Sequence, residues 1–294
     1  MITDEIQAGF REVQDHICNF LSAQDGVRYT EDRWDYAKGT GGGVTRVWER
    51  ATTIEKGGVN FSGIHGASLP ESAATQFKLP DGTPFFATGV SLVIHPWNPH
   101  IPTIHMNIRY FEAGDLWWFG GGIDVTPYYA VRDQVIAFHK AVRKVCEESG
   151  EDYAIHKKAC DEYFFLKHRG ETRGIGGIFY DHLNTSKEKN FDFCVRLGKA
   201  FTDLYRPFIE ANRGRKHTAE QREFQLYRRG RYVEFNLVYD RGTLFGLQSQ
   251  GRTESILMSL PAEAHWKYDW HPEPGTPEAE LTEVYLRPRD WANM

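Results

Sequence analysis

The sequence lacks the features that mark several large classes of protein. No apolar run in its 294 residues approaches the ~20 that a membrane-spanning helix requires, and residues 1–10 show no basic-then-apolar signal pattern. A net charge of −5 leaves no basic excess with which to bind nucleic acid. We therefore expect a cytoplasmic protein with neither a membrane span nor a nucleic-acid partner.

Motifs that bind cofactors or form disulfides are missing as well. There is no G-x-G-x-x-G after a predicted strand, no G-x-x-x-x-G-K-[ST] and no H-E-x-x-H. The four cysteines are scattered without a C-x-x-C pair, which is typical of small buried side chains in a reducing compartment. The glycine-rich segment 174–177 opens a predicted strand, whereas a phosphate loop would open a helix. The sequence therefore indicates no flavin, nicotinamide, attached haem or other organic cofactor.

One stretch, residues 103–129, carries the clearest pattern. Its first half alternates with period two, which places His105, Asn107 and Arg109 on one face of a strand. A turn at 112–115 and a second apolar run predict a β-hairpin, which three glycines and Asp124 follow. The polar face fits a solvated sheet surface. Because Trp117 and Trp118 indicate apolar cover nearby, we interpret this face instead as the floor of an anion-binding pocket.

Helical and alternating patterns continue along the whole chain. Helices are predicted at 3–24, 133–148, 152–167, 190–211 and 218–229. Besides the hairpin, strands are predicted at 44–51, 85–95, 173–181, 232–239, 244–247 and 256–260. The glycine-rich segment 57–68 reads as irregular, either a mobile cover over a site or a long connection. Without an internal repeat or a break in composition, residues 1–294 predict one α+β domain, a large antiparallel sheet covered by helices.

Three arginines and four histidines are candidates for ligand binding. Arg109, Arg173 and Arg252 lie beside glycine-rich backbone, which suggests a ligand with several carboxylates. Alternatively, each pairs with a nearby acid. The acids in question are Glu112, Glu171 and Glu254. The histidines either converge on a divalent transition metal or are hydrogen-bonded core residues. They are His95, His105, His139 and His168.

Several segments together resemble the aerobic, oxygen-dependent coproporphyrinogen III oxidases of haem biosynthesis. They keep their order over nearly the whole chain. They are G-G-G-V-T-R-V at 41–47, V-N-F-S at 59–62, S-L-V-I-H-P at 91–96, H-M-N-I-R-Y-F-E at 105–112, W-W-F-G-G-G-I-D-V-T-P-Y at 117–128, R-G-I-G-G-I-F-Y-D at 173–181 and G-R-Y-V-E-F-N-L-V-Y-D-R-G-T-x-F-G-L at 230–247. The resemblance implies a homodimer whose antiparallel sheet is sandwiched between helices. It also implies an enzyme that uses O2 as co-substrate to decarboxylate two propionates of coproporphyrinogen III to vinyl groups, giving protoporphyrinogen IX, CO2 and H2O2.

The resemblance also implies roles for individual residues. His105 is expected to donate a proton, and Asp124 to face the pyrrole N–H groups. A divalent metal, Mn or Fe, is expected at His95, His105, His139 and His168. Substrate contacts are expected at Ser91, Asn107, Ile108, Arg109, Arg173, Gln250, Gly251 and Arg252. Dimer contacts are expected within 232–265, at Tyr232, Glu234, Asn236 and Arg241.

The sequence departs from the family pattern at one position, and it is also compatible with two other functions. Many bacterial relatives read L-Q-T-G-G-R where this chain has L-Q-S-Q-G-R at 247–252, so Gln250 replaces a glycine, the residue that adopts positive φ without strain. The rivals are a histidine–metal oxygenase acting on another substrate and a tetrapyrrole carrier without turnover. For the oxidase we expect Asp124→Ala to leave folding intact and to lower turnover by at least ~10²-fold, the scale of a lost acid–base group.

Overall fold

The computed structural model describes residues 3–69, 74–75, 77–248 and 251–294. Within them, seven antiparallel strands form one sheet in the order β1-β2-β3-β4-β5-β6-β9. The strands are β1 (Thr30–Asp35), β2 (Gly39–Glu49), β3 (Ile54–Gly66), β4 (Phe85–Pro96), β5 (Thr103–Ala113), β6 (Leu116–Thr126) and β9 (Gly176–Leu183). A separate two-stranded ribbon joins β7 (Phe165–Leu166) to β8 (Glu171–Thr172).

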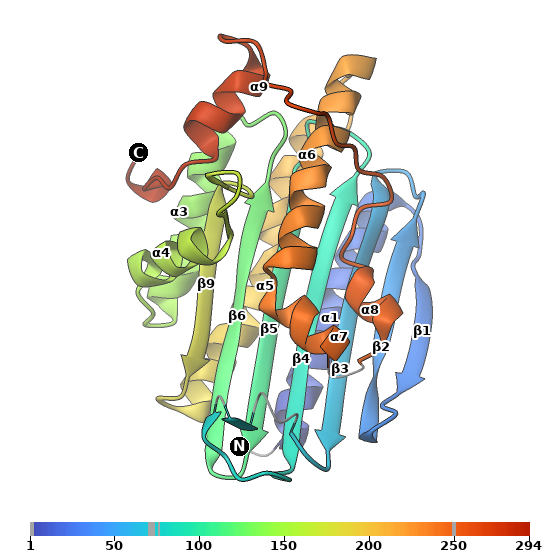
Figure 1. Cartoon of the computed structure of the whole chain (residues 1–294), viewed down its shortest axis with the longest axis vertical. Coiled ribbons are helices and arrows are strands. Elements are labelled where there is room, and N and C mark those ends of the chain that lie inside the picture. Colours follow the sequence, from blue (N-terminus) through green and yellow to red (C-terminus); the bar gives the residue numbers. More distant parts are fainter. Residues whose placement is uncertain (1–2, 70–73, 76, 249–250) are drawn as a thin grey trace.

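Helices cover both faces of the sheet, so the predicted α+β sandwich is confirmed (Figure 1). The helices are α1 (Thr3–Asp25), α3 (Arg132–Glu148), α4 (Tyr153–Tyr163), α5 (Lys187–Asn212), α6 (Ala219–Val238), α7 (Arg241–Gln248), α8 (Thr253–Leu257) and α9 (Pro277–Glu280), followed by a π-helical turn (Leu281–Tyr285) and a 3₁₀ turn (Trp291–Asn293). Helices α1 and α5 lie behind the sheet in Figure 1, and α6, α7 and α8 lie in front of it. No described helix is both long and apolar enough to cross a membrane.

The predicted hairpin is present as β5 and β6, joined at Gly114, which has the positive φ of 58° that glycine adopts without strain. By contrast, the segment 57–68 is not irregular, because most of it belongs to β3. Its glycines serve close packing: a Cβ at Gly58 would clash with Met258, which follows α8. Glycine content alone misled the sequence interpretation at this strand.

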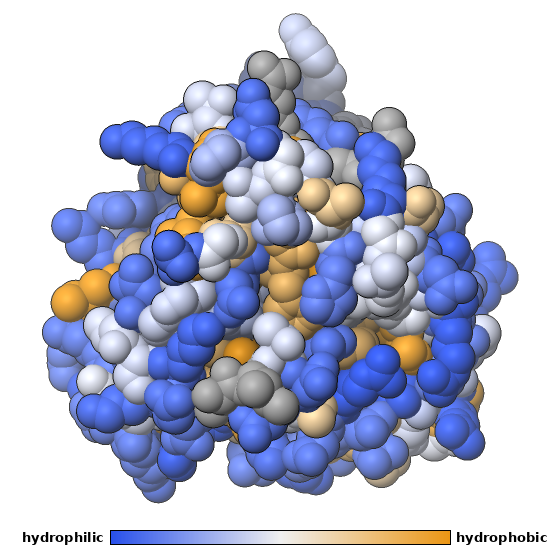
Figure 2. Space-filling model, turned by 90° about the horizontal axis from the view of Figure 1, so that it is seen from below, coloured by the Kyte–Doolittle hydropathy of each residue, from blue (hydrophilic) through white to orange (hydrophobic). Residues whose placement is uncertain are grey.

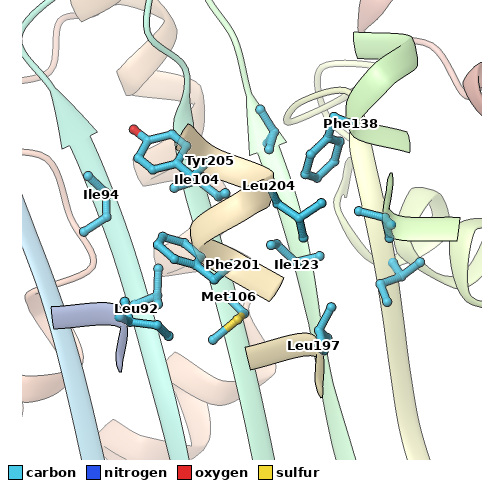
Figure 3. Packing of buried hydrophobic residues seen from close by; sticks show 14 of the residues in the cluster. Leu92, Ile94, Ile104, Met106, Ile123, Phe138, Leu197, Phe201, Leu204 and Tyr205 are labelled. Carbon is cyan, nitrogen blue, oxygen red and sulfur yellow. The ribbon is translucent and has the colours of Figure 1, made fainter. Parts of the chain in front are cut away.

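The main hydrophobic core lies between the sheet and the helices behind it. Side chains of β4, β5 and β6 contact those of α5 and of Phe138 on α3 (Figure 3). The labelled members are Leu92, Ile94, Ile104, Met106, Ile123, Phe138, Leu197, Phe201, Leu204 and Tyr205. Burial of this face fixes the register, so alternate residues of β5 are directed to the opposite face of the sheet.

The C-terminal third differs most from the sequence prediction. Residues 232–239, predicted as a strand, mostly belong to α6, and the segment 244–247 lies within α7. The segment 256–260 comprises the end of α8 and the turn that follows it. Helix α6 begins with a capping box formed by Thr218 and Gln221. Three of its four arginines are buried, namely Arg228, Arg229 and Arg231. Arg229 pairs with Glu55 on β3, and Arg228 pairs with Glu171. Because arginines in such long-range ion pairs occupy buried positions, the buried face of α6 does not show the apolar periodicity of a typical amphipathic helix.

Candidate functional site

Two adjoining cavities lie between the front face of the sheet and the helices that cover it. Their volumes are about 230 Å³ and about 550 Å³. Residues of β3, β4, β5, α4 and the start of α7 line both. These shared residues are Asn60, Ser91, Asn107, Arg109, Tyr163 and Gly242. The polar face of β5 is therefore the floor of a cavity and not a solvated surface.

The larger cavity has aromatic walls. Trp118 stacks on Phe111 and lies 4.9 Å, between ring centroids, from His182. Trp117, which the sequence grouped with Trp118, packs instead against the main core. Figure 2 shows the molecule from below. Hydrophobic residues reach the surface near the middle of this view, and hydrophilic residues surround them. The larger cavity can thus take a ligand with an apolar body.

The smaller cavity contains His105, which lies on β5 opposite Asp124 on β6. The His105 Nδ1 atom is 2.8 Å from Asp124 Oδ1. The Asp124 side chain is only 1% exposed, whereas that of His105 is 20% exposed. Nε2 of His105 has no hydrogen-bond partner among the described residues. The histidine therefore stands between the carboxylate and the cavity.

Asp124 has a second partner in Arg173, whose side chain is 2% exposed. The guanidinium donates from Nε to Oδ2 at 2.9 Å and from Nη2 to Oδ1 at 2.8 Å, and from Nη1 to the Asn236 amide oxygen at 3.0 Å. Burial acts to raise the pKa of Asp124, but the charge of Arg173 and the His105 hydrogen bond outweigh it and bring the pKa to about 2. Asp124 is thus ionised at neutral pH, and Nδ1 of His105 must carry a proton.

The three predicted arginines all pair with distant aspartates. Arg109 donates to Asp181 at 3.0 Å, and Arg241 on α7 reaches the other oxygen of Asp181 at 3.4 Å. Arg252 precedes α8 and pairs with Asp32 on β1, outside the residues that line the two cavities. The nearby glutamates have other partners, since Glu112 pairs with Lys187 and Glu171 with Arg228. Of the three, only Arg109 lines both cavities, and Arg173 is committed to Asp124.

The four histidines do not converge within the described part of this chain, and a metal at these residues stays a prediction. Within that part, no group of three or more His, Cys, Asp or Glu side chains is placed to hold a metal ion. Buried His95 donates from Nε2 to the Ser259 carbonyl and accepts from Thr103 at Nδ1. His139 is bonded in the same way to the Ile175 carbonyl and the Tyr153 hydroxyl.

The pKa values of these two histidines agree with a structural role. Burial, with the charge of Arg229, lowers the pKa of His95 well below its usual value. Burial also lowers the pKa of His139 to about 3. Each ring is neutral at pH 7 with both nitrogens bonded within the protein. His168 lies elsewhere, bonded to the Tyr239 hydroxyl at 2.9 Å and to Glu234 at 2.7 Å.

The remaining predicted substrate contacts are dispersed. Ser91 lines both cavities, as predicted for a pocket residue. The Ile108 side chain is fully buried on the face of the sheet opposite the cavities. There it packs against α5, since a Cβ added to Gly198 would lie 3.3 Å from its Cδ1 atom. The Gly251 amide donates to the Gly246 carbonyl at 2.8 Å. Gln250 falls outside the described residues.

All four predicted dimer residues make contacts inside the chain, Arg241 with Asp181 as described above. Tyr232 is buried beneath the Arg173 guanidinium, and Asn236 lines the smaller cavity. Glu234 accepts hydrogen bonds from four side chains, those of His168, Arg169, Arg231 and Trp266. Large apolar side chains are exposed nearby on α6 and α7 instead. They are Leu237, Val238, Leu244, Phe245 and Leu247.

Sequence reasoning missed several polar residues at the cavities, among them Tyr163, Asp181 and Asp240. Asp181 lies between two arginines, and Asp240 accepts from the Tyr163 hydroxyl at 2.9 Å. The sequence analysis placed Asp181 at the end of the predicted strand 173–181 and Asp240 just after the predicted strand 232–239, and gave neither residue a role. These contacts join positions more than 50 residues apart, so no local pattern encodes them.

Comparisons with known proteins agree with this arrangement. A sequence model of the family described as "Coproporphyrinogen III oxidase" matches residues 5–291. A protein of Dictyostelium discoideum named "Oxygen-dependent coproporphyrinogen-III oxidase" is 56% identical over 315 residues, covering 99% of this chain and 95% of that protein. The chain belongs to the coproporphyrinogen III oxidase family.

Proposed function

We propose that this protein oxidatively decarboxylates two propionates of coproporphyrinogen III, with O2 as co-substrate and protoporphyrinogen IX as product. For each propionate, the side chain loses CO2 and a hydride equivalent to become a vinyl group. O2 takes up that hydride equivalent and a proton to give H2O2. The observation that carries the proposal is the position of His105, held by ionised Asp124 at one end of a cavity that also contains Arg109.

The cavities suit a large macrocycle with charged arms. Pockets for ligands of drug size commonly measure about 300–1,000 Å³, and the larger cavity is within this range at about 550 Å³. Its aromatic walls would contact the faces of the pyrrole rings. Two arginines share Asp181, so the wall keeps one net positive charge for a carboxylate. The four propionates implied by the family resemblance match such a site.

Proton transfer is assigned to His105. Its Nδ1–H is held by Asp124, so Nε2 is the atom available to a substrate in the smaller cavity. Removal of a pyrrole proton would make the ring electron-rich, and it could then reduce O2 directly. The direct contact between Asp124 and pyrrole N–H groups, expected from the resemblance, is replaced in this proposal by a contact through His105. The reason is that Arg173 and His105 occupy both oxygens of this buried carboxylate.

The expected Mn or Fe site does not fit the residues of one chain. Three of its four histidines, His95, His139 and His168, have both ring nitrogens bonded within the protein. We therefore assign no step to a metal, and propose no organic cofactor. We retain the cytoplasm as the proposed compartment.

The proposal is tested by His105→Gln. We expect kcat for the O2-dependent conversion of coproporphyrinogen III to fall by ~10²-fold or more, because a general acid–base group is removed. His271→Gln is the matched control, since the His271 side chain is 82% exposed. Product fluorescence after reoxidation, together with peroxide, measures turnover. A wild-type protein that binds the substrate and returns it unchanged would support a carrier, and a near-normal kcat for His105→Gln would remove this residue from the mechanism.

We also propose that two copies of the chain associate through the exposed apolar residues of α6 and α7. Five large apolar side chains in this short region are unusual for a surface without a partner. Val238→Glu should convert a dimer into monomers in analytical ultracentrifugation. Ile155→Glu, at an exposed apolar residue on α4, should leave the dimer intact. A wild-type monomer at tens of micromolar would contradict this proposal.

A further inference from the structure

Tyr163, the last residue of α4, connects the floor of the cavities to their cover. Its ring stacks on that of Phe179 in β9, with centroids 4.2 Å apart and planes 6° apart. Its hydroxyl donates to Asp240 Oδ1 at 2.9 Å and accepts from the Arg241 backbone N–H at 3.1 Å. Burial, and then the nearby charge of Asp240, raises the pKa of Tyr163 to about 12, so the hydroxyl keeps its proton. The ring is fixed by β9 and the hydroxyl by the start of α7.

Asp240 connects this hydroxyl to the first turn of α7. While Oδ1 accepts from Tyr163, Oδ2 accepts from the Thr243 backbone N–H at 2.7 Å and from the Thr243 hydroxyl at 2.8 Å. A carboxylate at a helix N-terminus satisfies free N–H groups and interacts favourably with the helix dipole. Because one carboxylate oxygen is bound by Tyr163 on α4 and the other by Thr243 on α7, Asp240 orients the start of this helix.

The orientation of α7 places Arg241 at the cavity. The guanidinium carbon lies 4.8 Å from the centroid of the Tyr163 ring and 5.7 Å from that of Phe179. From there Nη2 reaches Asp181, the same carboxylate that holds Arg109. If α7 shifted by a few ångströms, Arg241 would leave Asp181 and the larger cavity would lose one of its two arginines.

We propose that Tyr163 is a positioning residue, whose hydroxyl holds Asp240 and the start of α7 so that Arg241 stays beside Arg109 for a substrate carboxylate. This inference rests on the proposed function. Tyr163 then acts on substrate binding through Arg241 rather than on the chemistry at His105. Its removal should therefore change KM and leave kcat nearly unaltered.

The test is Tyr163→Phe, which keeps the stacked ring and removes only the hydroxyl. We expect KM for coproporphyrinogen III to rise roughly tenfold, the scale of a lost hydrogen bond to a charged group, with kcat within about twofold. Arg241→Gln should raise KM as well. The double variant should be no worse than the more severe single variant, because both changes remove one interaction. Tyr129→Phe is the matched control: its hydroxyl also donates to a carboxylate, that of Glu278, away from the cavities.

Amide hydrogen exchange tests the same contact without substrate. The amides of 241–248 should exchange roughly tenfold faster in Tyr163→Phe, as expected for the loss of one such hydrogen bond, and at the wild-type rate in Tyr129→Phe. An unchanged KM, a fall in kcat alone, or KM effects of Tyr163→Phe and Arg241→Gln that multiply would each overturn the proposal. If the wild-type protein had no oxidase activity, the proposed function would fail, while exchange at 241–248 would still report on the contact of Tyr163 with α7.

Discussion

Replacing Asp124 by asparagine should weaken folding as well as catalysis. The side chain of Asp124 is the counter-ion of Arg173, and both side chains are almost fully buried, at 1% and 2% exposure. Asparagine is nearly isosteric but neutral, and its amide nitrogen would face a guanidinium that can only donate. The sequence alone suggested that a change at Asp124 would leave folding intact. That expectation did not include a buried arginine that depends on this carboxylate.

The cost follows from the structure. Removing one partner of a buried ion pair typically costs about 3–5 kcal/mol, because the other charge is left uncompensated. Since asparagine keeps one acceptor, we expect Asp124→Asn to lower the free energy of unfolding by about 3 kcal/mol at pH 7. We expect kcat to fall by ~10²-fold or more, because the His105 ring loses the carboxylate that orients it.

The pH dependence has a definite sign. Folding lowers the pKa of Asp124 from 3.8 to about 2, so the ionised carboxylate stabilises the folded state above pH 3.8. This contribution is lost as the pH falls from 3.8 towards 2. It amounts to roughly 2 kcal/mol, from 1.36 kcal/mol per pKa unit. The difference in unfolding free energy between wild type and Asp124→Asn should therefore narrow by about that amount in acid.

Urea denaturation at several pH values measures these differences. A second substitution serves as the control: Arg173→Met in the Asp124→Asn background removes the uncompensated charge. The double variant should recover stability, because apolar replacements of buried ion pairs are often tolerated, but it should not recover turnover. If Asp124→Asn unfolds within 1 kcal/mol of wild type at pH 7, the reasoning about Arg173 is refuted.

Two further predictions concern Arg109, which lines both cavities, and Glu234 on α6. Arg109→Ala should raise KM for coproporphyrinogen III at least tenfold, because a charge-assisted bond to a carboxylate contributes roughly 1.5–3 kcal/mol. Arg215→Ala, at an exposed arginine, should leave KM unchanged. Equal effects of the two substitutions on KM in steady-state kinetics would discredit carboxylate binding by Arg109. Glu234→Gln should lower the free energy of unfolding by about 2 kcal/mol, because this carboxylate accepts hydrogen bonds from four side chains of the same chain. Urea denaturation measures the difference, and an unchanged midpoint of unfolding would contradict the prediction.

The hairpin could be predicted from the sequence because it depends on local alternation, whereas helices on both faces of the sheet were implied by the family resemblance. His105 and Arg109 alternate with fully buried Ile104 and Ile108, so a period of two identified the strand and its cavity-facing side. The same rule failed for the covering helix α6. There Tyr232, Phe235 and Asn236 lie on its buried face, but the apolar residues of this segment also alternate and resemble a strand.

The roles of the charged residues could not be predicted from local sequence. The sequence analysis gave Arg173 and Arg109 the same candidate role in carboxylate binding, yet Arg173 neutralises Asp124 from 49 positions away. His95 and His139 were candidate metal ligands, but each is bonded to a carbonyl and a hydroxyl that only the folded chain brings near. A side chain's partner decides whether it is structural or functional, and these partners are set by the register of the sheet.

We propose that O2 oxidises coproporphyrinogen III in the cavities beside His105 without a four-histidine metal centre. The direct measurement is to mix chelator-treated protein with coproporphyrinogen III under anaerobic conditions and then add a pulse of O2. We predict one CO2 and one H2O2 for each propionate converted to a vinyl group, with protoporphyrinogen IX as the final product. A substrate recovered unchanged, or turnover that returns only when manganese or iron is restored, would contradict the account.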